Sequence, residues 1–457
     1  MKLNLKDKKV LVLGLGDTGL SALRWLGRQG AVLSVADTRI QPPGLDRVRA
    51  ELPDTKVYLG EFEDAPFEQA ETIVISPGLP LVTPQVQAAI QRGIPVIGDV
   101  ELFAQYRPAK AKVIAITGAN GKSTVTTMVG EMCRAAGLKT IVAGNIGLPV
   151  LDALNEEAPD VYVLELSSFQ LETTSSLQAE AATVLNLSED HMDRYAGMAE
   201  YAAAKARIFR GAAIQVLNRQ DTWSMGMSVA GKPQVTFGND APTSDDDYGL
   251  RVQDGSTAFA QGKTVLLDVA EMHVAGLHNA TNALVAMALC RAIGIAWQPL
   301  LDALREFKGL PHRVQWVAEV DGVAFYDDSK GTNVGATCAA IAGMPRRVVL
   351  IAGGDGKGQD FSPLREPVTQ NARAVVLIGR DGPQIAAALK DGGVPLIEAP
   401  TLKFAVQAAF KAAKPGDAVL LSPACASFDM FRNYVHRAEV FVEAVKALAA
   451  GAGLEAR

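Results

Sequence analysis

The chain has 457 residues, of which 48% are hydrophobic and 21% are charged, and its formal net charge is −6. This length suits about three domains of ~150 residues each in a globular protein. The acidic balance and the lack of a basic run argue against nucleic acid as a partner, because binding to a phosphate backbone depends on clustered Lys and Arg.

The lack of a targeting signal and the pattern of cysteines point to the cytoplasm. The first residues contain no apolar core of signal-peptide length, and no stretch reaches the ~18 continuous apolar residues of a membrane span. The four cysteines, Cys133, Cys290, Cys338 and Cys425, lie far apart in apolar or small-residue segments without metal-type spacing. We therefore expect a cytoplasmic protein without membrane insertion, whose cysteines are buried free thiols.

Strand-like apolar runs alternate with helical patterns along most of the chain, which favours parallel sheets covered by helices on both faces. Two segments divide this pattern. At residues 106–110 a helix ending near Ala104 gives way to a new strand, and at residues 309–313 Gly and Pro stop a helix that ends near Phe307. We predict three α/β domains, at residues 1–108, 109–309 and 310–457.

In the first domain, a strand at 10–13 runs into GLGDTG (residues 14–19), and the next strand, 32–36, ends at Asp37. A third strand, 72–75, is followed by Ser76, Pro77 and Gly78. The spacing G-x-G-x-x-G is the Rossmann dinucleotide fingerprint, so an NAD-dependent oxidoreductase using Gly14, Gly16, Gly19 and Asp37 is one interpretation. Glycines that bring a helix N-terminus close to a pyrophosphate will also receive other diphosphates.

In the second domain, a strand at 113–117 leads into the loop TGANGKST (residues 117–124) and a helix to 136. Glycines there let backbone N–H groups surround phosphates, Lys122 reaches the β and γ oxygens, and the hydroxyl of Ser123 can bind Mg²⁺. The spacing differs from the standard P-loop. A second strand, 161–164, ends at Glu165, where nucleoside triphosphatases place the acid that serves the metal. The two signals together predict a P-loop-type ATPase domain.

The remainder of this domain holds two further candidate residues. Strands are expected at 140–143 and 182–187, and His191 follows the latter in a polar loop, as a ligand or as a capping or surface histidine. Lys205 lies in a predicted helix, 198–210, where it would by itself be a solvent-exposed lysine. Short alternating runs between residues 223 and 274 predict a small β-rich insertion.

The third domain opens with strands at 314–320 and 323–326, joined by Asp321 and Gly322, which predicts a β-hairpin. Strands at 348–352, 374–378 and 418–421 alternate with helices, and a final helix is expected from about Met430. The glycine-rich stretch GGDGKG (residues 353–358) contains Lys357 and is also compatible with a flexible turn.

Taken together, nine segments resemble the Mur ligases in all three domains and in order. They are TGANGKST, AGNIG (143–147), ELSSFQLE (165–172), DHMDR (190–194), AAAKARIF (202–209), HNATNA (278–283), GLPHR (309–313), DDSKGTN (327–333) and LSPACASFDMF (421–431). The resemblance implies an N-terminal Rossmann-like UDP-binding domain, a central ATPase domain and a C-terminal Rossmann-like domain that binds an amino acid.

The resemblance also implies an ADP-forming acid–amino-acid ligase of peptidoglycan precursor synthesis, a pathway that serves the cell wall, cell shape and cell division. Within the family, the motifs favour addition of D-glutamate to UDP-N-acetylmuramoyl-L-alanine through an acyl phosphate. The implied cofactors are ATP, Mg²⁺ at two sites and a carbamate that CO₂ forms on Lys205. We expect a monomer whose partners are these small molecules.

Residue by residue, the family match assigns five groups of functional residues. The expected catalytic residues are Lys122, Glu165, His191 and Lys205, and the expected metal ligands are Ser123, Glu165, His191 and carbamylated Lys205. The expected ATP contacts are Gly118, Asn120, Gly121, Lys122, Ser123, Thr124, Asn279, Arg313 and Asp328. The expected UDP-substrate contacts are Leu15, Asp17, Thr18, Asp37, Thr38, Arg39, Ser76, Gly78 and Asn145. The expected D-glutamate contacts are Lys330, Thr332, Lys357, Ser427, Phe428 and Tyr434.

Several alternatives stay open at this point. Asn279 is also suited to cap the helix that follows it, and Tyr434 stands where Phe is expected in this subgroup. A sibling ligase for another amino acid is disfavoured by ELSSFQLE and LSPACASFDMF and by the lack of an Asp-Asn-Pro-Arg motif. Two other classes are the NAD-dependent oxidoreductase, which leaves the ATP motifs unexplained, and a nucleotide-regulated binding protein without chemistry.

Overall fold

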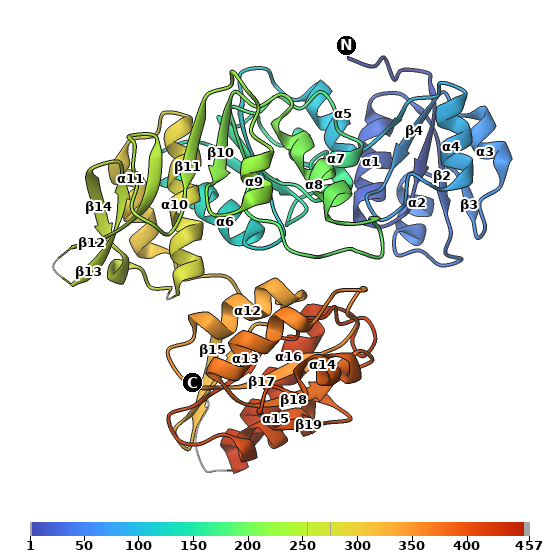
Figure 1. Cartoon of the computed structure of the whole chain (residues 1–457). Coiled ribbons are helices and arrows are strands. Elements are labelled where there is room, and N and C mark those ends of the chain that lie inside the picture. The colour runs from blue at the N-terminus through green and yellow to red at the C-terminus, as the bar shows by residue number, and fades with distance from the viewer. Residues whose placement is uncertain (1, 254, 275, 452–457) are drawn as a thin grey trace. The chain divides into compact units, whose positions relative to one another are not determined.

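The computed structural model describes residues 2–253, 255–274 and 276–451, which build three sheets with helices (Figure 1). The chain forms two compact units. The first holds the residues up to Asn186 together with Ala199–Asp268 and Asn282–Arg305. The second holds Leu187–Met198, Val269–Thr281 and the chain from Glu306 onward.

The first sheet is parallel, with five strands in the order β3-β2-β1-β4-β5. Its strands are β1 (Lys9–Leu13), β2 (Val32–Asp37), β3 (Lys56–Leu59), β4 (Thr72–Ile75) and β5 (Val96–Ile97). Its helices are α1 (Asp17–Arg28), α2 (Leu45–Glu51), α3 (Asp64–Gln69), α4 (Pro84–Gln91) and α5 (Asp99–Tyr106). Figure 1 shows α1 on one face of the sheet and α3 and α4 on the other. The predicted strands 10–13, 32–36 and 72–75 are confirmed.

The strand order reverses at the centre of this sheet. After β1 the chain builds outward through β2 and β3, then returns to place β4 and β5 on the other side of β1. The carboxyl ends of β1 and β4 are therefore neighbours, which is the position where open α/β sheets bind ligands.

The second sheet has nine strands in the order β14-β13-β12-β11-β10-β9-β6-β8-β7. Its parallel strands are β6 (Lys112–Thr117), β7 (Thr140–Gly144), β8 (Val161–Glu165), β9 (Ala181–Val184), β10 (Ile214–Asn218), β11 (Gln234–Phe237) and β12 (Asp247–Gln253). The strands β13 (Ser256–Gln261) and β14 (Thr264–Asp268) are antiparallel. The region 223–274 is thus β-rich as predicted, and its strands extend the main sheet.

Two predicted elements of this domain are too long. The strand expected at 182–187 ends at Val184, and beyond it Asn186 contacts the loop at residues 117–124 (the ATP loop), where the N–H of Ala119 donates to the carbonyl oxygen of Asn186 (2.9 Å). The helix expected at 198–210 is α8 (Met198–Ala206), followed by a 3₁₀ turn, Arg207–Phe209. The other helices are α6 (Lys122–Ala135), α7 (Ser168–Glu172), α9 (Thr222–Gly226), α10 (Leu277–Ala292) and α11 (Trp297–Glu306).

The third sheet has six strands in the order β15-β16-β20-β17-β18-β19, of which β15 is antiparallel to its neighbour. The strands are β15 (Gln315–Val320), β16 (Val323–Asp327), β17 (Val348–Gly353), β18 (Ala372–Ile378), β19 (Leu396–Glu398) and β20 (Ala418–Leu421). The helices are α12 (Val334–Gly343), α13 (Arg365–Asn371), α14 (Gly382–Leu389), α15 (Leu402–Ala412) and α16 (Tyr434–Gly451). The final helix begins four residues later than predicted, because Met430 and Phe431 form a separate turn whose N–H groups donate to the carbonyl oxygen of Ser427.

Alternate side chains of the central strand β17 build two cores. Val349 and Ile351 pack with residues of α15 and α16, whereas Val348 and Leu350 pack with residues of α12, α13 and α14. This alternation is what a strand buried on both faces requires, and it explains the continuous apolar run in its sequence.

The predicted hairpin joins β15 to β16 through two residues with left-handed backbone conformation, Asp321 (φ 48°) and Gly322 (φ 76°). Positive φ at both positions is what a type I′ turn needs. The cysteine prediction is only partly right. All four are free thiols and Cys133, Cys290 and Cys425 are buried, but Cys338 on α12 is partly exposed, and its Sγ donates to the carbonyl oxygen of Pro363 (3.5 Å).

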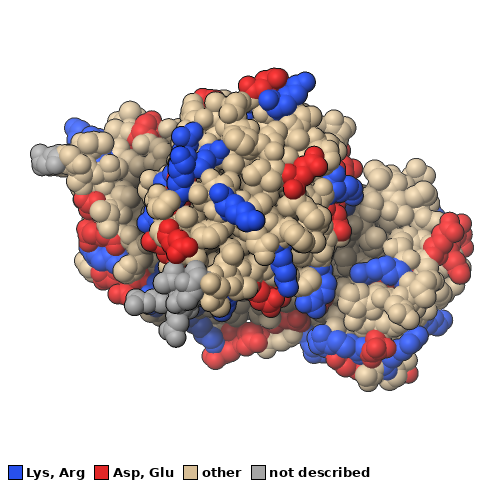
Figure 2. Space-filling view, turned by 90° about the horizontal axis from the view of Figure 1, so that it is seen from below, with Lys and Arg blue, Asp and Glu red and all other residues tan. Residues whose placement is uncertain are grey.

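Charges of both signs are intermingled on the face of the molecule shown in Figure 2. In the part of the chain that the structure describes, no helix is long and apolar enough to cross a membrane.

A buried carboxyl group lies where the first sheet's last helix meets the second sheet's domain. Asp99, the first residue of α5, is 3% exposed; its Oδ2 accepts a long hydrogen bond from Nε2 of Gln170 (3.4 Å), and its Oδ1 has no hydrogen-bond partner. Burial raises the pKa of Asp99 to about 6, outweighing the hydrogen bonds that lower it. The charged form is therefore destabilising in the fold, and stability that is present below the unfolded pKa is lost as the pH rises through about 6.

We expect Asp99→Asn to raise the free energy of unfolding at pH 7.5 by about 1–2 kcal/mol, since about two pKa units correspond to roughly 3 kcal/mol and the amide retains only part of the hydrogen bonding. Urea unfolding at several pH values measures this, with the gain shrinking toward pH 4. Asp46→Asn, an exposed change on α2, is the control. A gain that is the same at both ends of the pH range would contradict the titration of Asp99 as its cause.

Candidate functional site

The turn between β1 and α1 has the backbone geometry of a diphosphate-binding loop. Gly14 has a φ of +89°, and a Cβ on Gly19 would lie 1.8 Å from the carbonyl oxygen of Gly14, so only glycine fits at position 19. The helix N-terminus thereby comes close to the loop, where its dipole and N–H groups favour an anion. Ser76 donates from Oγ to the carbonyl oxygen of Gly14 (3.3 Å), so the two predicted turns of this domain lie side by side.

Asp37 is already neutralised by groups of this chain. Its carboxylate is 3% exposed and accepts hydrogen bonds from Nε (2.8 Å) and Nη2 (2.6 Å) of Arg39 and from the N–H of Leu15 (2.7 Å). Burial works to raise its pKa, but these hydrogen bonds and the charge of Arg39 lower the pKa overall. An acid that binds the ribose of NAD would need a free oxygen, so this arrangement gives no specific support to the oxidoreductase alternative.

The other residues predicted for the UDP substrate surround this loop with differing exposure. The side chain of Leu15 is fully buried, and its carbonyl oxygen accepts from the N–H of Gly44 (3.1 Å). Asp17, Thr38 and Gly78 are exposed, and Thr18 is half-buried. A contact from Leu15 would therefore come from its backbone, while the other four have accessible surface.

The loop between β6 and α6 depends on two glycines with positive φ, Gly118 (155°) and Gly121 (84°). A Cβ on Gly118 would lie 2.9 Å from the Cβ of Leu185, which keeps this position small. Lys122 folds over the loop, where its Nζ donates to the carbonyl oxygens of Gly118 and Ala119 (both 2.9 Å). The ammonium group is thus held at the loop, where it can meet an anion.

Asn186 holds this loop in shape, and the sequence interpretation missed it. Its Oδ1 accepts from the N–H of Asn120 (2.9 Å), its Nδ2 donates to the carbonyl oxygen of Asn120 (3.1 Å), and its own carbonyl oxygen accepts from Ala119. The apolar run places this residue in a predicted strand that reaches 187. The sequence does contain one signal for its role: it is a polar residue directly after an apolar strand.

Glu165 ends β8 beside β6 and has the features of a cation ligand. It is 2% exposed, its Oε1 accepts from Nδ2 of Asn145 (2.8 Å), and its Oε2 is buried without a hydrogen-bond partner. A buried carboxylate oxygen without a donor is costly unless a cation or another group meets it. Asn145, predicted to contact the UDP substrate, here orients Glu165.

Lys205 is buried, which overturns its interpretation as a solvent-exposed helix lysine. The residue is 2% exposed, and its Nζ lies 4.8 Å from the ring centroid of Tyr201. This Nζ donates to Oγ1 of Thr117 (3.2 Å) and to the carbonyl oxygen of Gly118 (3.0 Å), the oxygen that Lys122 also contacts. The fold thus gathers two amino groups at this loop from α6 and α8, although Lys205 lies 87 positions beyond Gly118 in sequence.

Among the described residues, no group of three or more His, Cys, Asp and Glu side chains lies close enough to hold a metal. Hydroxyl oxygens at the ATP loop are a further kind of metal ligand. Ser123 and Thr124, both 6% exposed, open α6 at this loop.

In the second unit, the loop that carries His191 is tied to the glycine-rich stretch after β17. His191 has a φ of 59°, and its Nε2 lies 3.7 Å from Oδ2 of Asp190. The Oδ1 of Asp190 accepts from Nζ of Lys357 (2.5 Å), and the N–H of Asp360 donates to Oε2 of Glu189 (3.2 Å). Lys357 therefore does not lie in a loose turn, because its side chain forms a largely buried ion pair next to His191.

Asp328 follows β16 and is 6% exposed. Burial raises its pKa to about 7, against the lowering effects of the hydrogen bond from Ser422 and of the charge of Arg313. Its Oδ2 accepts from Oγ of Ser422 (2.6 Å), and its Oδ1 accepts from the N–H of Val314 (3.3 Å). The two predicted ATP contacts Arg313 and Asp328 thus influence each other electrostatically.

Asn279 is not the residue that precedes the helix, as the capping interpretation requires. The helix α10 begins at Leu277, so Asn279 lies inside its first turn, with its N–H donating to the carbonyl oxygen of Gly276 (3.0 Å). One turn later, Oδ1 of Asn282 lies 2.6 Å from where a Cβ on Gly121 would be, in the first unit. The sequence interpretation missed Asn282, although it stands in the same HNATNA motif.

The residues predicted for the amino acid lie on connected loops of the second unit. Nζ of Lys330 lies 3.9 Å from the ring centroid of Tyr434. Ser427 is 3% exposed and Phe428 is 73% exposed. The loop that holds Lys330 and Thr332 is joined to the loop after β20 by a bond from the N–H of Ala424 to the carbonyl oxygen of Gly331 (3.0 Å).

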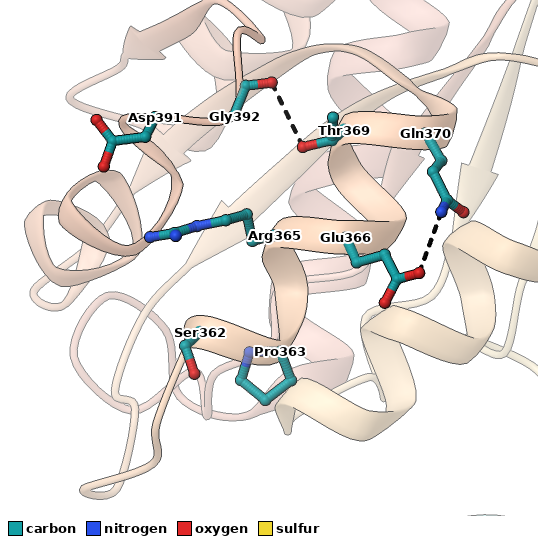
Figure 3. A pocket seen from close by; sticks show the side chains of 8 residues that line it. All are labelled: Ser362, Pro363, Arg365, Glu366, Thr369, Gln370, Asp391 and Gly392. Atoms are coloured by element: carbon teal, nitrogen blue, oxygen red, sulfur yellow. Dashed lines mark hydrogen bonds between the residues drawn. The ribbon is translucent and has the colours of Figure 1, made fainter.

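A surface hollow of about 660 Å³ lies elsewhere in the second unit (Figure 3). It is lined by Ser362, Pro363, Arg365, Glu366, Thr369, Gln370, Asp391 and Gly392. None of these described residues is among the predicted contacts. Figure 3 shows the bond by which Thr369 links α13 to Gly392, so the hollow follows from how α13 meets that loop.

Comparison with known families matches three segments of the chain. Residues 8–98 match the Mur ligase MurD-like N-terminal domain, residues 116–290 the Mur ligase middle domain, and residues 312–425 the Mur ligase glutamate ligase domain.

Two similar curated proteins are both named UDP-N-acetylmuramoylalanine–D-glutamate ligase. The one from Methylobacillus flagellatus is 68% identical over 97% of this chain and 98% of its own length. The one from Thiobacillus denitrificans is 58% identical over 98% of each chain. Among solved structures, UDP-N-acetylmuramate–alanine ligase from Thermotoga maritima has a similar fold, with a TM-score of 0.60 at 19% identity over 96% of this chain and 99% of that one.

We expect Asn186→Ala to weaken ATP binding about tenfold, because the two lost side-chain hydrogen bonds to Asn120 are worth about 1–2 kcal/mol in loop order. The backbone bond to Ala119 remains, so the variant should fold. Titration calorimetry with ATP measures the change, with Asn155→Ala, which removes a surface bond to Arg28, as the control. Equal dissociation constants for the wild type and Asn186→Ala would contradict a role for Asn186 in ordering the loop.

Proposed function

The chain belongs to the Mur ligase family, and from that membership we propose that it joins D-glutamate to UDP-N-acetylmuramoyl-L-alanine with conversion of ATP to ADP and phosphate. Relatives of 68% and 58% identity that carry this activity in their name match nearly the whole chain. The structural observation that carries the proposal is the meeting of Lys122 and Lys205 at the carbonyl oxygen of Gly118. A protein that only binds a nucleotide would not need Lys205, a second and buried lysine, at this loop.

The reaction needs positive charge at this loop. A carboxylate is a poor acyl donor, so ATP first phosphorylates the L-alanine carboxylate, and the amine of D-glutamate then displaces phosphate from the acyl phosphate. Two anions must meet in the first step. Lys122 would neutralise the transferring phosphoryl group, with backbone N–H groups of Gly121, Ser123 and Thr124 around the phosphates.

We propose that Mg²⁺ binds at two sites, with Ser123 and Glu165 serving the ATP metal and His191 the second. The buried, unpartnered Oε2 of Glu165 and the hydroxyl of Ser123 fit this ion, because Mg²⁺ prefers oxygen ligands. When bound, Mg²⁺ supplies positive charge against the phosphate oxygens.

Lys205 is proposed to act as a carbamate. Its neutral amine would attack the carbon of CO₂, forming an N–C bond and releasing a proton, and the product is a carboxylate-like group. An ordinary ammonium would repel Mg²⁺, whereas this anion would attract it. The burial of Lys205 and its contacts with Thr117 and Gly118 support this proposal, because they place the amino group at the loop proposed to hold the triphosphate.

The division of labour follows the proposed domains. Residues 1–108 would hold the UDP part of the substrate at the Gly14–Gly19 loop, residues 109–309 the triphosphate, and residues 310–457 the amino acid. Asn279, Arg313 and Asp328 would complete the ATP site. We propose a monomer that works in the cytoplasm.

We expect phosphate release from ATP to require D-glutamate and UDP-N-acetylmuramoyl-L-alanine together. A phosphate assay against a panel of L-alanine, D-glutamate, a diamino acid and a dipeptide, with and without the UDP substrate, measures this. Turnover with another amino acid would identify a sibling ligase instead. Binding of NAD without ATP turnover would overturn the proposal.

We expect Lys205→Ala to lose activity by about 10³-fold or more, because the carbamate's electrostatic contribution to the transition state is removed. Short carboxylic acids such as acetate should restore part of the rate by occupying the vacated space. Lys232→Ala, which removes a lysine that donates to the carbonyl oxygen of Ala212, is the matched control. Full activity in Lys205→Ala would remove this lysine from the mechanism.

A further inference from the structure

One arginine without a predicted role lies at the centre of the second unit. Arg437, in the first turn of α16, is fully buried (0% exposed). Its guanidinium donates to Oγ of Ser329 from Nε (3.1 Å) and to the carbonyl oxygen of Ser329 from Nη2 (2.8 Å). From Nη1 it donates to the carbonyl oxygens of Cys425 (3.1 Å) and, at longer range, Ala426 (3.4 Å).

Burying this charge has an energetic cost that its surroundings must offset. Transfer of an arginine out of water is strongly unfavourable unless its donors are hydrogen-bonded. Burial lowers the pKa of Arg437 to about 10, so the guanidinium is still charged at neutral pH. For stability alone, an apolar side chain at this position would serve as well. Its hydrogen bonds to Ser329, Cys425 and Ala426 all go to two loops, which suggests a reason of another kind.

Those two loops carry most of the residues proposed for D-glutamate. Ser329 directly precedes Lys330, and Thr332 follows on the same loop after β16. Cys425 and Ala426 directly precede Ser427 and Phe428 on the loop after β20. The guanidinium therefore fixes the distance between two pairs of proposed contacts without touching any of them.

Two further contacts depend on the same centre. Ser329 donates from its Oγ to the carbonyl oxygen of Tyr434, the first residue of α16. Ala426 exchanges backbone hydrogen bonds with Asp355 (2.8 and 3.0 Å), which lies two residues before Lys357. Five of the six proposed D-glutamate contacts are thus within two residues of a group bonded to Arg437 or to one of its partners, and Thr332 lies three residues after Ser329 on the same loop.

We propose that Arg437 is the positioning residue of the amino-acid site, holding the loops after β16 and β20 at the spacing that the two carboxylates of D-glutamate require. This inference rests on the proposed function. An arginine suits the role because its planar fork reaches three acceptors in fixed directions, whereas a lysine is a single point charge.

Asp328, the proposed ATP contact next to Ser329, is held in place by other hydrogen bonds, which allows a specific test. Asp328 is held by Ser422, by the N–H of Val314 and by its own N–H, which donates to the carbonyl oxygen of Leu421 (2.8 Å). None of these bonds involves Arg437. Loss of the guanidinium should therefore raise the KM for D-glutamate by a much larger factor than the KM for ATP, to which Arg437 contributes only the charge that it places near Asp328.

The experiment compares Arg437→Lys, Arg437→Ala and the wild type in D-glutamate-dependent phosphate release. We expect the KM for D-glutamate to rise about tenfold in Arg437→Lys and further in Arg437→Ala, since each lost charged hydrogen bond is worth about a tenfold change. Guanidinium ion, at concentrations well below denaturing ones, should lower the KM of Arg437→Ala again, and urea at the same concentration should not.

Two further variants keep the test decisive if Arg437→Ala folds poorly. Ser329→Ala removes one guanidinium acceptor and the bond to Tyr434, and should raise the same KM by a smaller factor. Phe441→Leu alters another fully buried side chain of α16, and should lower the melting temperature without raising the KM for D-glutamate.

The outcomes separate the two levels of the argument. A wild type that releases phosphate without any dependence on D-glutamate would refute the proposed function. A wild type that depends on D-glutamate, with Arg437→Lys and Ser329→Ala unchanged in that KM, would refute the positioning role. An equal rise of every KM in Arg437→Lys and Phe441→Leu would also refute it, because it would mark a general loss of structure.

Discussion

Parallel pairing of β6 with β8 and β9 is the constraint on which the ATP half of the molecule depends. Parallel strands end at the same edge of a sheet. This edge therefore holds the loop after Thr117, the carboxylate of Glu165 and the amide of Asn186, although they are far apart in sequence. The first sheet uses the same rule with β1 and β4. In each case the reversal of strand order opens a space at which helix N-termini can face phosphate.

Several charged side chains are buried at the positions proposed for the chemistry. Lys205, Glu165, Asp328 and Arg437 are all at most 6% exposed. Each would be a liability in a protein built only for stability. Their donors and acceptors come from loops at strand ends. Glu165 keeps one oxygen unpartnered within the described structure, whereas Arg437 has acceptors for each of its three nitrogens. We interpret Glu165 as a proposed cation ligand and Arg437 as a residue that positions two loops.

Local patterns in the sequence were sufficient for much of the fold. Continuous apolar runs identified strands such as β4 and β20 to the residue, because strands buried on both faces need no alternation. Asp321 and Gly322 predicted the hairpin, because few residues accept positive φ twice in succession. The errors occur where contacts with distant segments end a strand earlier, or start a helix later, than the local pattern predicts. The strand expected to reach residue 187 ends at Val184, and α16 starts only at Tyr434.

The candidate site divides in the same way. The loop glycines, Lys122 and Glu165 could be found from the sequence, since their chemistry depends on neighbours along the chain or at a strand end. Nothing local marked Lys205 as buried, because helical periodicity does not say which distant loop a face will meet.

The sequence by itself therefore determined the three α/β domains, the order of their strands and helices, and the two phosphate-type loops, because these depend on periodicity and on glycine backbone freedom. Only the tertiary structure decided that Lys205 shares the carbonyl oxygen of Gly118 with Lys122, that Asn186 holds the ATP loop, and that Arg437 joins the loops after β16 and β20. Hydrogen bonds between residues 66 to 108 positions apart depend on how sheets and helices pack, which no local pattern specifies.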